Sequence, residues 1–247
     1  MNTLSRSLKI YIGLLIAFAI LTGVNVFMPQ GSIFSSQEFP VSKPLFALLV
    51  ACIMLVLYGG LGFIGLRLSS RLGFTGLWDE TVSVKQRLLI PSIIGVGIGI
   101  FFILADTVFS KFHSLGPLPH PPFPTSLIAS ASAGIGEEIL FRLFFISFWT
   151  WLISHVFLKG KWQERTFRIV VVFSALAFAF AHLPAIMFLL GLKTMSEIPP
   201  ALMAEIILLN GIVSVFAAYY FRKYGFLSAV SIHFWTDVVW HVLWGLK

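Results

Sequence analysis

The stretch Ser126–Trp151, SLIASASAGIGEEILFRLFFISFWTW, decides how the chain must fold. A helix of this length rises about 39 Å at 1.5 Å per residue, which is enough to cross the roughly 30 Å hydrocarbon core of a bilayer. Yet Glu137, Glu138 and Arg142 lie in its interior. An ionisable side chain in hydrocarbon costs at least a few kcal/mol, so such residues face protein partners and mark functional sites. We therefore expect a membrane helix whose polar face points into a helix bundle.

The composition of the whole chain is that of a membrane protein. Of its 247 residues, 58% are hydrophobic and 11% are charged, and the mean hydropathy is +0.95. A soluble domain carries about 25% charged residues. Seven apolar runs are long enough to span a bilayer, and we predict them at 8–28, 44–66, 88–109, 126–151, 169–191, 201–221 and 226–246. The predicted fold class is therefore all-α, a polytopic membrane bundle of about seven transmembrane helices.

The basic residues between these runs predict the orientation of the bundle. Twelve Lys and Arg residues fall on one side and four on the other, which are Lys43, Lys111, Lys193 and Lys247. The positive-inside rule then places the N-terminus in the cytoplasm and the C-terminus outside. We expect an integral, multi-pass protein of a prokaryotic plasma membrane. The net charge of +7 reflects this orientation and does not indicate a nucleic-acid partner. The single cysteine, Cys52, excludes disulfides and any multi-cysteine metal site.

Polar residues in three of the predicted spans lie at the same depth. Glu137 lies about 14 residues before Trp151, His182 about 14 after Arg168, and Asp237 about 14 after Lys223, which corresponds to roughly 21 Å in each case. His233 lies one turn before Asp237. Because composition does not require this agreement, it predicts that the three helices bring their polar groups to one site.

Helical spacing separates the two adjacent glutamates. Glu138 and Arg142 are four residues apart and can pair along one helix face. Glu137 is rotated from Glu138 by about 100°, so its carboxylate is left to point at the site. A carboxylate buried away from water can act as a general base, and histidines can bind a catalytic metal or donate to an oxyanion. The pattern therefore indicates hydrolysis by an activated water.

Three motifs in the second half of the chain resemble those of a known family. They are Glu-Glu-x-x-x-Arg at Glu137–Arg142, Phe-x-x-x-His at Phe178–His182, and His-x-x-x-Asn/Asp at His233–Asp237. In this order they resemble the CAAX protease and bacteriocin-processing intramembrane endopeptidases, which include the type II CAAX prenyl endopeptidases. The resemblance covers roughly residues 124–245. We accordingly divide the chain into N-terminal spans (1–123, three helices) and a catalytic core (124–247, four helices).

The resemblance implies an intramembrane endopeptidase acting on membrane-associated substrates, either prenylated CAAX-type or bacteriocin-related. Glu137 and His182 would activate the water, while His233 and Asp237 would stabilise the oxyanion or complete a metal site. Orientation of His233 by Asp237 fits the pattern equally well. The supporting residues are Glu138, Arg142 and Phe178.

Members of the family have been described both as metallopeptidases and as metal-free glutamate peptidases. A zinc site in this chain would use His182 and His233 with Glu137 or Asp237. We expect no obligatory metal, because a carboxylate that serves as the base cannot also be a tight ligand unless another acid replaces it.

Other functions fit parts of the same pattern. A non-proteolytic membrane protein of this fold could act in bacteriocin self-immunity or as an adaptor. A proton-coupled transporter would also carry intramembrane Glu, His and Asp, but the sequence lacks the repeats and paired interrupted helices of such proteins. A serine protease is disfavoured because Ser130 and Ser132 lack a Gly-x-Ser setting.

The remaining ionisable groups near the predicted spans are expected to be structural or solvated. Asp106 lies close to a helix end and should reach the interface, and Glu205 lies one turn into its span. His113 and His120 belong to the outer loop and should be solvated or interfacial, and His241 should take part in packing. The segment Gly116–Pro124 is rich in proline, which fixes φ and predicts a structured loop.

Overall fold

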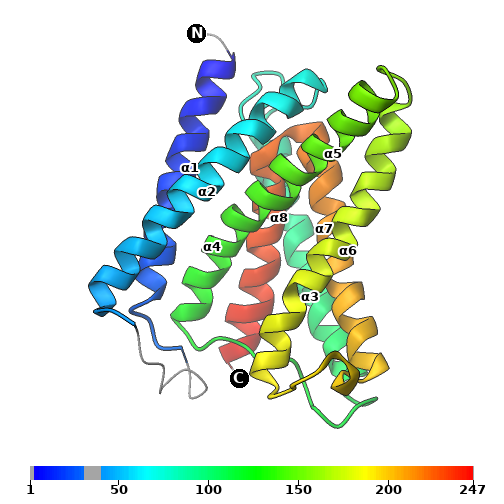
Figure 1. Ribbon diagram of the computed structural model, residues 1–247. Helices are drawn as coiled ribbons and strands as arrows, with labels where there is room; N and C mark the ends of the chain where they lie inside the picture. Colours follow the sequence, from blue (N-terminus) through cyan, green and yellow to red (C-terminus); the bar gives the residue numbers. More distant parts are fainter. Residues whose placement is uncertain (1–2, 31–39, 247) are drawn as a thin grey trace.

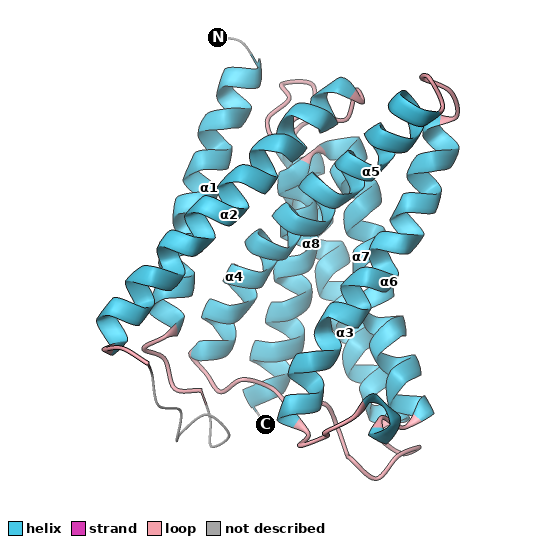
Figure 2. Ribbon diagram, in the orientation of Figure 1, coloured by secondary structure: helices cyan, strands magenta, loops and turns pink. Residues whose placement is uncertain are grey.

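Helices make up most of residues 3–30 and 40–246, which are the part of the chain that this computed structural model describes. No strand occurs in those residues (Figure 2). Seven of the helices are long and apolar enough to cross a membrane. The chain is therefore an integral, multi-pass, all-α membrane protein, as its composition predicts.

Each predicted span coincides with one helix or one continuous series of helical segments. The elements, with π and 3₁₀ segments labelled η, are α1 (Thr3–Asn25), α2 (Lys43–Arg71), η2 (Lys85–Leu89), α3 (Ile90–Phe109), α4 (Thr125–Glu138), η3 (Ile139–Ile146), α5 (Ser147–Trp151), η4 (Leu152–Phe157), α6 (Gln163–Leu189), η5 (Met195–Glu197), α7 (Pro200–Tyr224), α8 (Phe226–Asp237), η6 (Val238–Leu243) and η7 (Trp244–Leu246). The segments from α4 to η4 form the fourth span, which is the longest at 33 residues.

Helix α8 lies at the centre of the bundle and packs against α3, α4 and α7 (Figure 1). Two glycines of α3 allow it to approach α8 closely. A Cβ on Gly95 would lie 2.4 Å from the Ile232 carbonyl oxygen, and one on Gly99 would lie 2.6 Å from the Val239 Cβ. Small residues permit this kind of backbone approach between membrane helices. The position of α8, and of the polar residues that it carries, is therefore fixed by direct backbone packing.

The loops at one end of the bundle are joined by contacts between distant segments. Arg6 pairs with Glu80 at 3.2 Å, the Thr75 amide donates to the Arg222 carbonyl at 3.2 Å, and Gln163 Nε2 donates to a carbonyl at the end of α2. We call this the basic end, because the spans and loops that meet there carry twelve basic residues: Arg6, Lys9, Arg67, Arg71, Lys85, Arg87, Lys159, Lys161, Arg165, Arg168, Arg222 and Lys223. The opposite end, where α8 and its continuation finish, is called the C-terminal end (Figure 1).

Candidate active site

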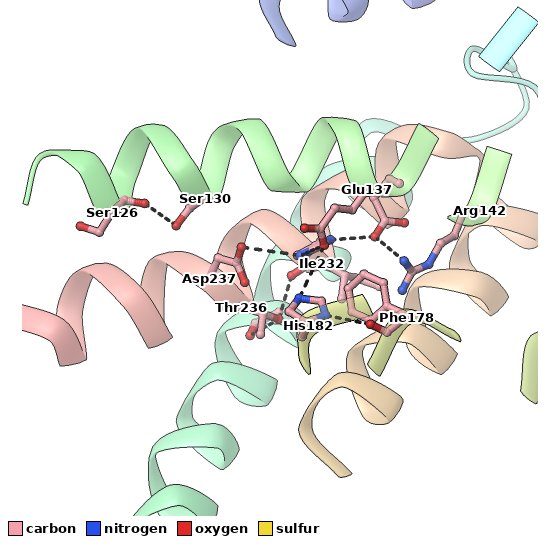
Figure 3. A network of polar contacts seen from close by, with 12 residues as sticks. Ser126, Ser130, Glu137, Arg142, Phe178, His182, Ile232, Thr236 and Asp237 are labelled. Carbon is pink, nitrogen blue, oxygen red and sulfur yellow. Dashed lines mark hydrogen bonds and ion pairs between the residues drawn. The ribbon is translucent and has the colours of Figure 1, made fainter. Parts of the chain in front are cut away.

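Glu137, on α4, points its carboxylate at His182 of α6 (Figure 3), and His233 of α8 lies at a similar distance. Its Oε2 atom lies 3.9 Å from His182 Nε2 and 3.7 Å from His233 Nε2. His233 Nε2 also lies 3.6 Å from Asp237 Oδ2. These separations are too long for direct hydrogen bonds but suit groups that share a small polar molecule between them. The structure thus brings together the four residues for which the sequence predicts a catalytic role.

Glu138 contacts the other ring nitrogen of His233 and also holds Arg142. Its Oε1 atom lies 3.1 Å from Arg142 Nη1 and accepts a hydrogen bond from His233 Nδ1 at 2.8 Å. Both the Glu138 and the Arg142 side chains are fully buried. The pair with Arg142 is the one that helical spacing predicts. The bond to His233 is an addition, and it gives Glu138 a second role, because it fixes the orientation of the His233 ring.

His182 is oriented by its own helix. Its Nδ1 lies 2.8 Å from the Phe178 carbonyl oxygen, and since a carbonyl can only accept, Nδ1 carries a proton. In the neutral ring, Nε2 is then the atom with a free lone pair, and it faces Glu137. Pro184, two residues further along α6, has no amide hydrogen. One backbone hydrogen bond of the helix is therefore missing next to this histidine.

The Phe178 ring packs against both histidines of the site. It is almost fully buried and contacts the rings of His182 and His233, with centroids 4.8 and 5.6 Å apart. The Arg142 guanidinium lies over the same ring at 4.5 Å. A cation over an aromatic face is attracted by the ring quadrupole. The Phe178 ring therefore links the buried ion pair to both histidines, while the carbonyl oxygen of the same residue orients His182.

Both helices that carry acidic site residues change from α to π geometry beside those residues. η3 begins directly after Glu138, and η6 begins directly after Asp237. π-helical segments are rare and are frequently found at functional sites. This local geometry was not predicted from the sequence.

The four candidate catalytic residues line a cavity of about 370 Å³. At about 30 Å³ per water molecule, this is room for roughly a dozen waters. Its polar lining is completed by Ser130, Asn210 and His241, and the remaining lining is apolar. Glu137 and His182 each have a third of their side-chain surface exposed. A carboxylate and an imidazole that reach water inside a membrane bundle can bind and polarise that water.

Comparison with known protein families gives a match over the same part of the chain. The family model described as "Type II CAAX prenyl endopeptidase Rce1-like" matches residues 119–239, which contain all three motifs. The chain belongs to this family. No curated protein and no solved structure gives a significant match. At the level of the family, the Rce1-like match identifies a protease of the CAAX type that works within the membrane.

The Rce1-like match leaves two finer predictions untested. The division of the chain into 1–123 and 124–247 stays a prediction, and so do the individual roles of the site residues. What the structure adds is that the groups of the three motifs lie together, in the arrangement that Figure 3 shows.

The donor atoms of the site do not form a set ready for a metal ion. Among residues 3–30 and 40–246, no group of three or more His, Cys, Asp or Glu side chains is arranged to hold one. His233 Nδ1 is occupied by Glu138, so each histidine can offer only its Nε2 atom. Because the donor set as it stands does not fit a metal, we derive no catalytic step through one. The prediction that no metal is obligatory stays a prediction.

Two histidines of the loop between α3 and α4 lie elsewhere than the sequence predicts. The His113 side chain is buried, with Nε2 lying 3.7 Å from Glu205 Oε2, and His120 Nδ1 lies 3.1 Å from His241 Nδ1. Burial lowers the pKa of His120. Asp106 is also buried, and it accepts a hydrogen bond from the Leu118 amide at 2.9 Å instead of reaching the interface. These contacts fix the loop that forms one wall of the cavity, and no sequence pattern reports them.

Proposed function

We propose that this protein is an intramembrane endopeptidase that hydrolyses a membrane-associated peptide with a water activated by Glu137 and His182. The observation that carries the proposal is the position of Glu137 Oε2, which is buried, accepts no hydrogen bond from protein, and lies within 4 Å of two histidine nitrogens. Because a third of the Glu137 side chain is exposed in the cavity, its carboxylate can take a proton from a water held there. A general base in this position contributes roughly 10²- to 10⁴-fold to the rate.

In the proposed reaction, a water between Glu137 and His182 donates one hydrogen to each of them. Its oxygen attacks the scissile carbonyl carbon as Glu137 takes the proton, and Glu137 then gives that proton to the leaving amine. The amide bond breaks and a carboxylic acid and an amine are released, so the atoms of the peptide and of the water account for both products. Because the Nδ1 proton of His182 is engaged by the Phe178 carbonyl, Nε2 is kept directed at the water.

His233 and Asp237 complete the proposal. With a proton on Nε2, His233 donates a hydrogen bond to the oxyanion that forms during attack, which lowers the energy of the transition state. Asp237, 3.6 Å from that nitrogen, favours a proton there through its negative charge, and Glu138 fixes the opposite side of the ring. The substrate class is a peptide within or at the membrane, of the prenylated CAAX type or related to bacteriocins.

The test is the Glu137→Gln variant, which keeps the shape of the side chain and removes the base. We expect turnover of a farnesylated CAAX peptide, or of the natural substrates found by comparing peptide termini in membranes from cells with either protein, to fall by at least about 10²-fold. Glu80→Gln is the matched control, because Glu80 is exposed at the basic end and pairs only with Arg6 at the surface. A Glu137→Gln protein that keeps its cellular phenotype would favour the non-proteolytic adaptor instead.

A further inference from the structure

One histidine of the cavity wall takes no part in the proposed reaction. His241 follows Asp237 by one helical turn toward the C-terminal end of the bundle, and it lines the same cavity as the four candidate catalytic residues. Its Nδ1 atom lies 3.1 Å from Nδ1 of His120, which belongs to the loop between α3 and α4. The ring nitrogen of His241 that remains for a ligand is therefore Nε2.

The surroundings of His120 indicate where the protons of this pair lie. A hydrogen bond between two ring nitrogens needs one donor and one acceptor. His120 Nε2 is buried and has no hydrogen-bond partner, and buried N–H groups without a partner are rarer than buried acceptors without one. Neutral His120 thus carries its proton on Nδ1 and donates it to His241. Neutral His241 then carries its own proton on Nε2, which makes that atom a hydrogen-bond donor to the cavity.

His120 is fixed from several sides, and it therefore fixes His241. Its ring packs edge-on against Trp240, with centroids 4.6 Å apart. A Cβ on Gly245 would lie 2.9 Å from the His120 Cβ, so the end of the last span is packed closely against this loop. Burial lowers the pKa of His120 and the charge of Asp106 opposes that shift, so a carboxylate is near enough to favour an additional proton on the pair. A donor held in this way loses little freedom when a ligand binds.

A carboxylate that enters the cavity has few other partners. The described residues that line the cavity include the two acids Glu137 and Asp237 and no Lys or Arg. A carboxylate moved there from water loses its hydration and needs a donor in exchange. His182 and His233 are assigned to the water and to the oxyanion, so His241 is the histidine left to bind it. A hydrogen bond to a charged acceptor is also about twice as strong as one between neutral groups.

We propose that His241, positioned by His120, binds the C-terminal carboxylate of the substrate peptide and so selects which peptide bond reaches the catalytic groups. Along the helix axis His241 lies about 6 Å beyond Asp237 and about 12 Å beyond His233. An extended peptide covers about 3.3–3.6 Å per residue, so these distances correspond to roughly two to three residues between the carboxylate and the scissile bond. This inference rests on the proposed peptidase function and names the part of the substrate that is recognised. An Asp or Glu side chain of the substrate offers the same chemistry, and the test separates the two sources.

The test compares three farnesylated peptides of one sequence: the free C-terminal acid, its C-terminal amide, and an amide whose last residue is Glu. In the wild type, kcat/KM for the acid should exceed that for the plain amide by at least about tenfold, and in His241→Ala this ratio should fall to near one. A purely structural defect would slow both peptides alike and leave the ratio unchanged. A wild-type ratio near one, or the wild-type ratio in His241→Ala, would overturn the inference. Equal turnover of the acid and the Glu-ending amide would overturn the assignment to the C-terminus.

Two further histidine variants make the comparison specific. His155→Ala is the matched control, because His155 is on η4, lies 3.0 Å from Ser154 Oγ and does not line the cavity. Its acid-to-amide ratio should equal that of the wild type, and a ratio near one would overturn the inference. His120→Ala should lower the ratio, since His241 loses the bond that sets its proton. An unchanged ratio in His120→Ala would overturn the positioning role of His120.

Binding in a Glu137→Gln background separates this inference from the proposed reaction. The affinities of fluorescently labelled acid and amide peptides can be measured in micelles by anisotropy. We expect the acid to bind at least about tenfold more tightly, and this preference to disappear when His241→Ala is added. Equal affinities of the two peptides would overturn the inference whatever the turnover. If Glu137→Gln remained active while the preference for the acid persisted, the mechanism would be wrong and the role of His241 would stand.

Discussion

The buried ion pair between Glu138 and Arg142 offers a quantitative test of how the site is held. The two side chains are fully buried and their charged atoms are 3.1 Å apart. At an effective dielectric constant of about 20, two unit charges at that distance attract each other by roughly 5 kcal/mol. Removing one partner from a buried pair typically costs about 3–5 kcal/mol, because the other charge is left uncompensated. We therefore expect Arg142→Met to destabilise the fold by about 3 kcal/mol or more.

Because His233 donates a hydrogen bond to Glu138, replacing Glu138 and replacing Arg142 should cost different amounts of stability. In Arg142→Met, the Glu138 carboxylate keeps His233 as a donor, so the loss should lie at the lower end of the range. In Glu138→Leu, the guanidinium has lost its carboxylate and retains the Phe178 ring, so the loss should be larger. The double variant Glu138→Leu/Arg142→Met removes both charges. Since replacing a whole buried pair by apolar residues is often close to neutral, the double variant should be more stable than Glu138→Leu alone.

The measurement is the free energy of unfolding in mixed micelles for the wild type, the two single variants and the double variant. The coupling energy from this cycle should be at least about 2 kcal/mol. Two results would refute the reasoning: a loss within about 1 kcal/mol in Arg142→Met, which is the value of a surface pair, or additive losses in the double variant. All three variants should also lose peptidase activity, and Glu138→Gln should retain more of it, since its amide oxygen can still accept from His233.

The remaining predictions concern packing, pH and metal. Gly95→Ala should destabilise the protein, because its Cβ would lie 2.4 Å from the Ile232 carbonyl oxygen. Gly97→Ala on the same helix is the control: its Cβ would meet nothing within 4 Å, so it should be neutral or stabilising by up to about 1 kcal/mol. Equal thermal stabilities of the two variants would contradict this prediction. Burial lowers the pKa of His120 in the folded state, so the unfolded chain binds more protons and stability should fall as the pH drops below about 6.5. Thermal unfolding of His120→Gln across this range should show a smaller loss, and an identical loss would count against it. Chelator treatment should leave turnover unchanged, while stoichiometric zinc together with chelator-sensitive turnover would show that a metal is required.

The membrane spans and the side-chain pairs within one helix could be predicted from the sequence, because both depend only on residues close together in the chain. Apolar length predicts each membrane helix, and a spacing of four residues predicts the pair of Glu138 with Arg142. Counting residues from the basic end also brought Glu137, His182 and Asp237 to a common depth. That argument works because membrane helices are nearly parallel, so position along the chain converts to depth.

Whether two side chains at the same depth touch depends on how each helix is rotated about its axis and on where each side chain points. Counting residues gives the depth but neither of these. For this reason the bond from His233 to Glu138 could not be predicted, and neither could the π-helical segments beside the two carboxylates. The outer loop shows the same limit more strongly. His113 and His120 are in a segment without periodicity, so hydrophilicity suggested solvent, whereas their partners are Glu205 and His241.

The relative positions of the proposed catalytic groups depend on the placement of α8 more than on that of any other helix. It carries His233 and Asp237, while the base and its water-binding partner belong to α4 and α6. A misplacement of about 1 Å in a catalytic group can cost roughly 10²-fold in rate. A Cβ added at Gly95 or Gly99 would lie less than 3 Å from backbone atoms of α8. Any side chain at these positions must therefore push α8 away by a distance on the order of 1 Å. The packing of α3 on α8 should therefore control activity more steeply than stability, because the bundle can absorb a small shift that the catalytic geometry cannot.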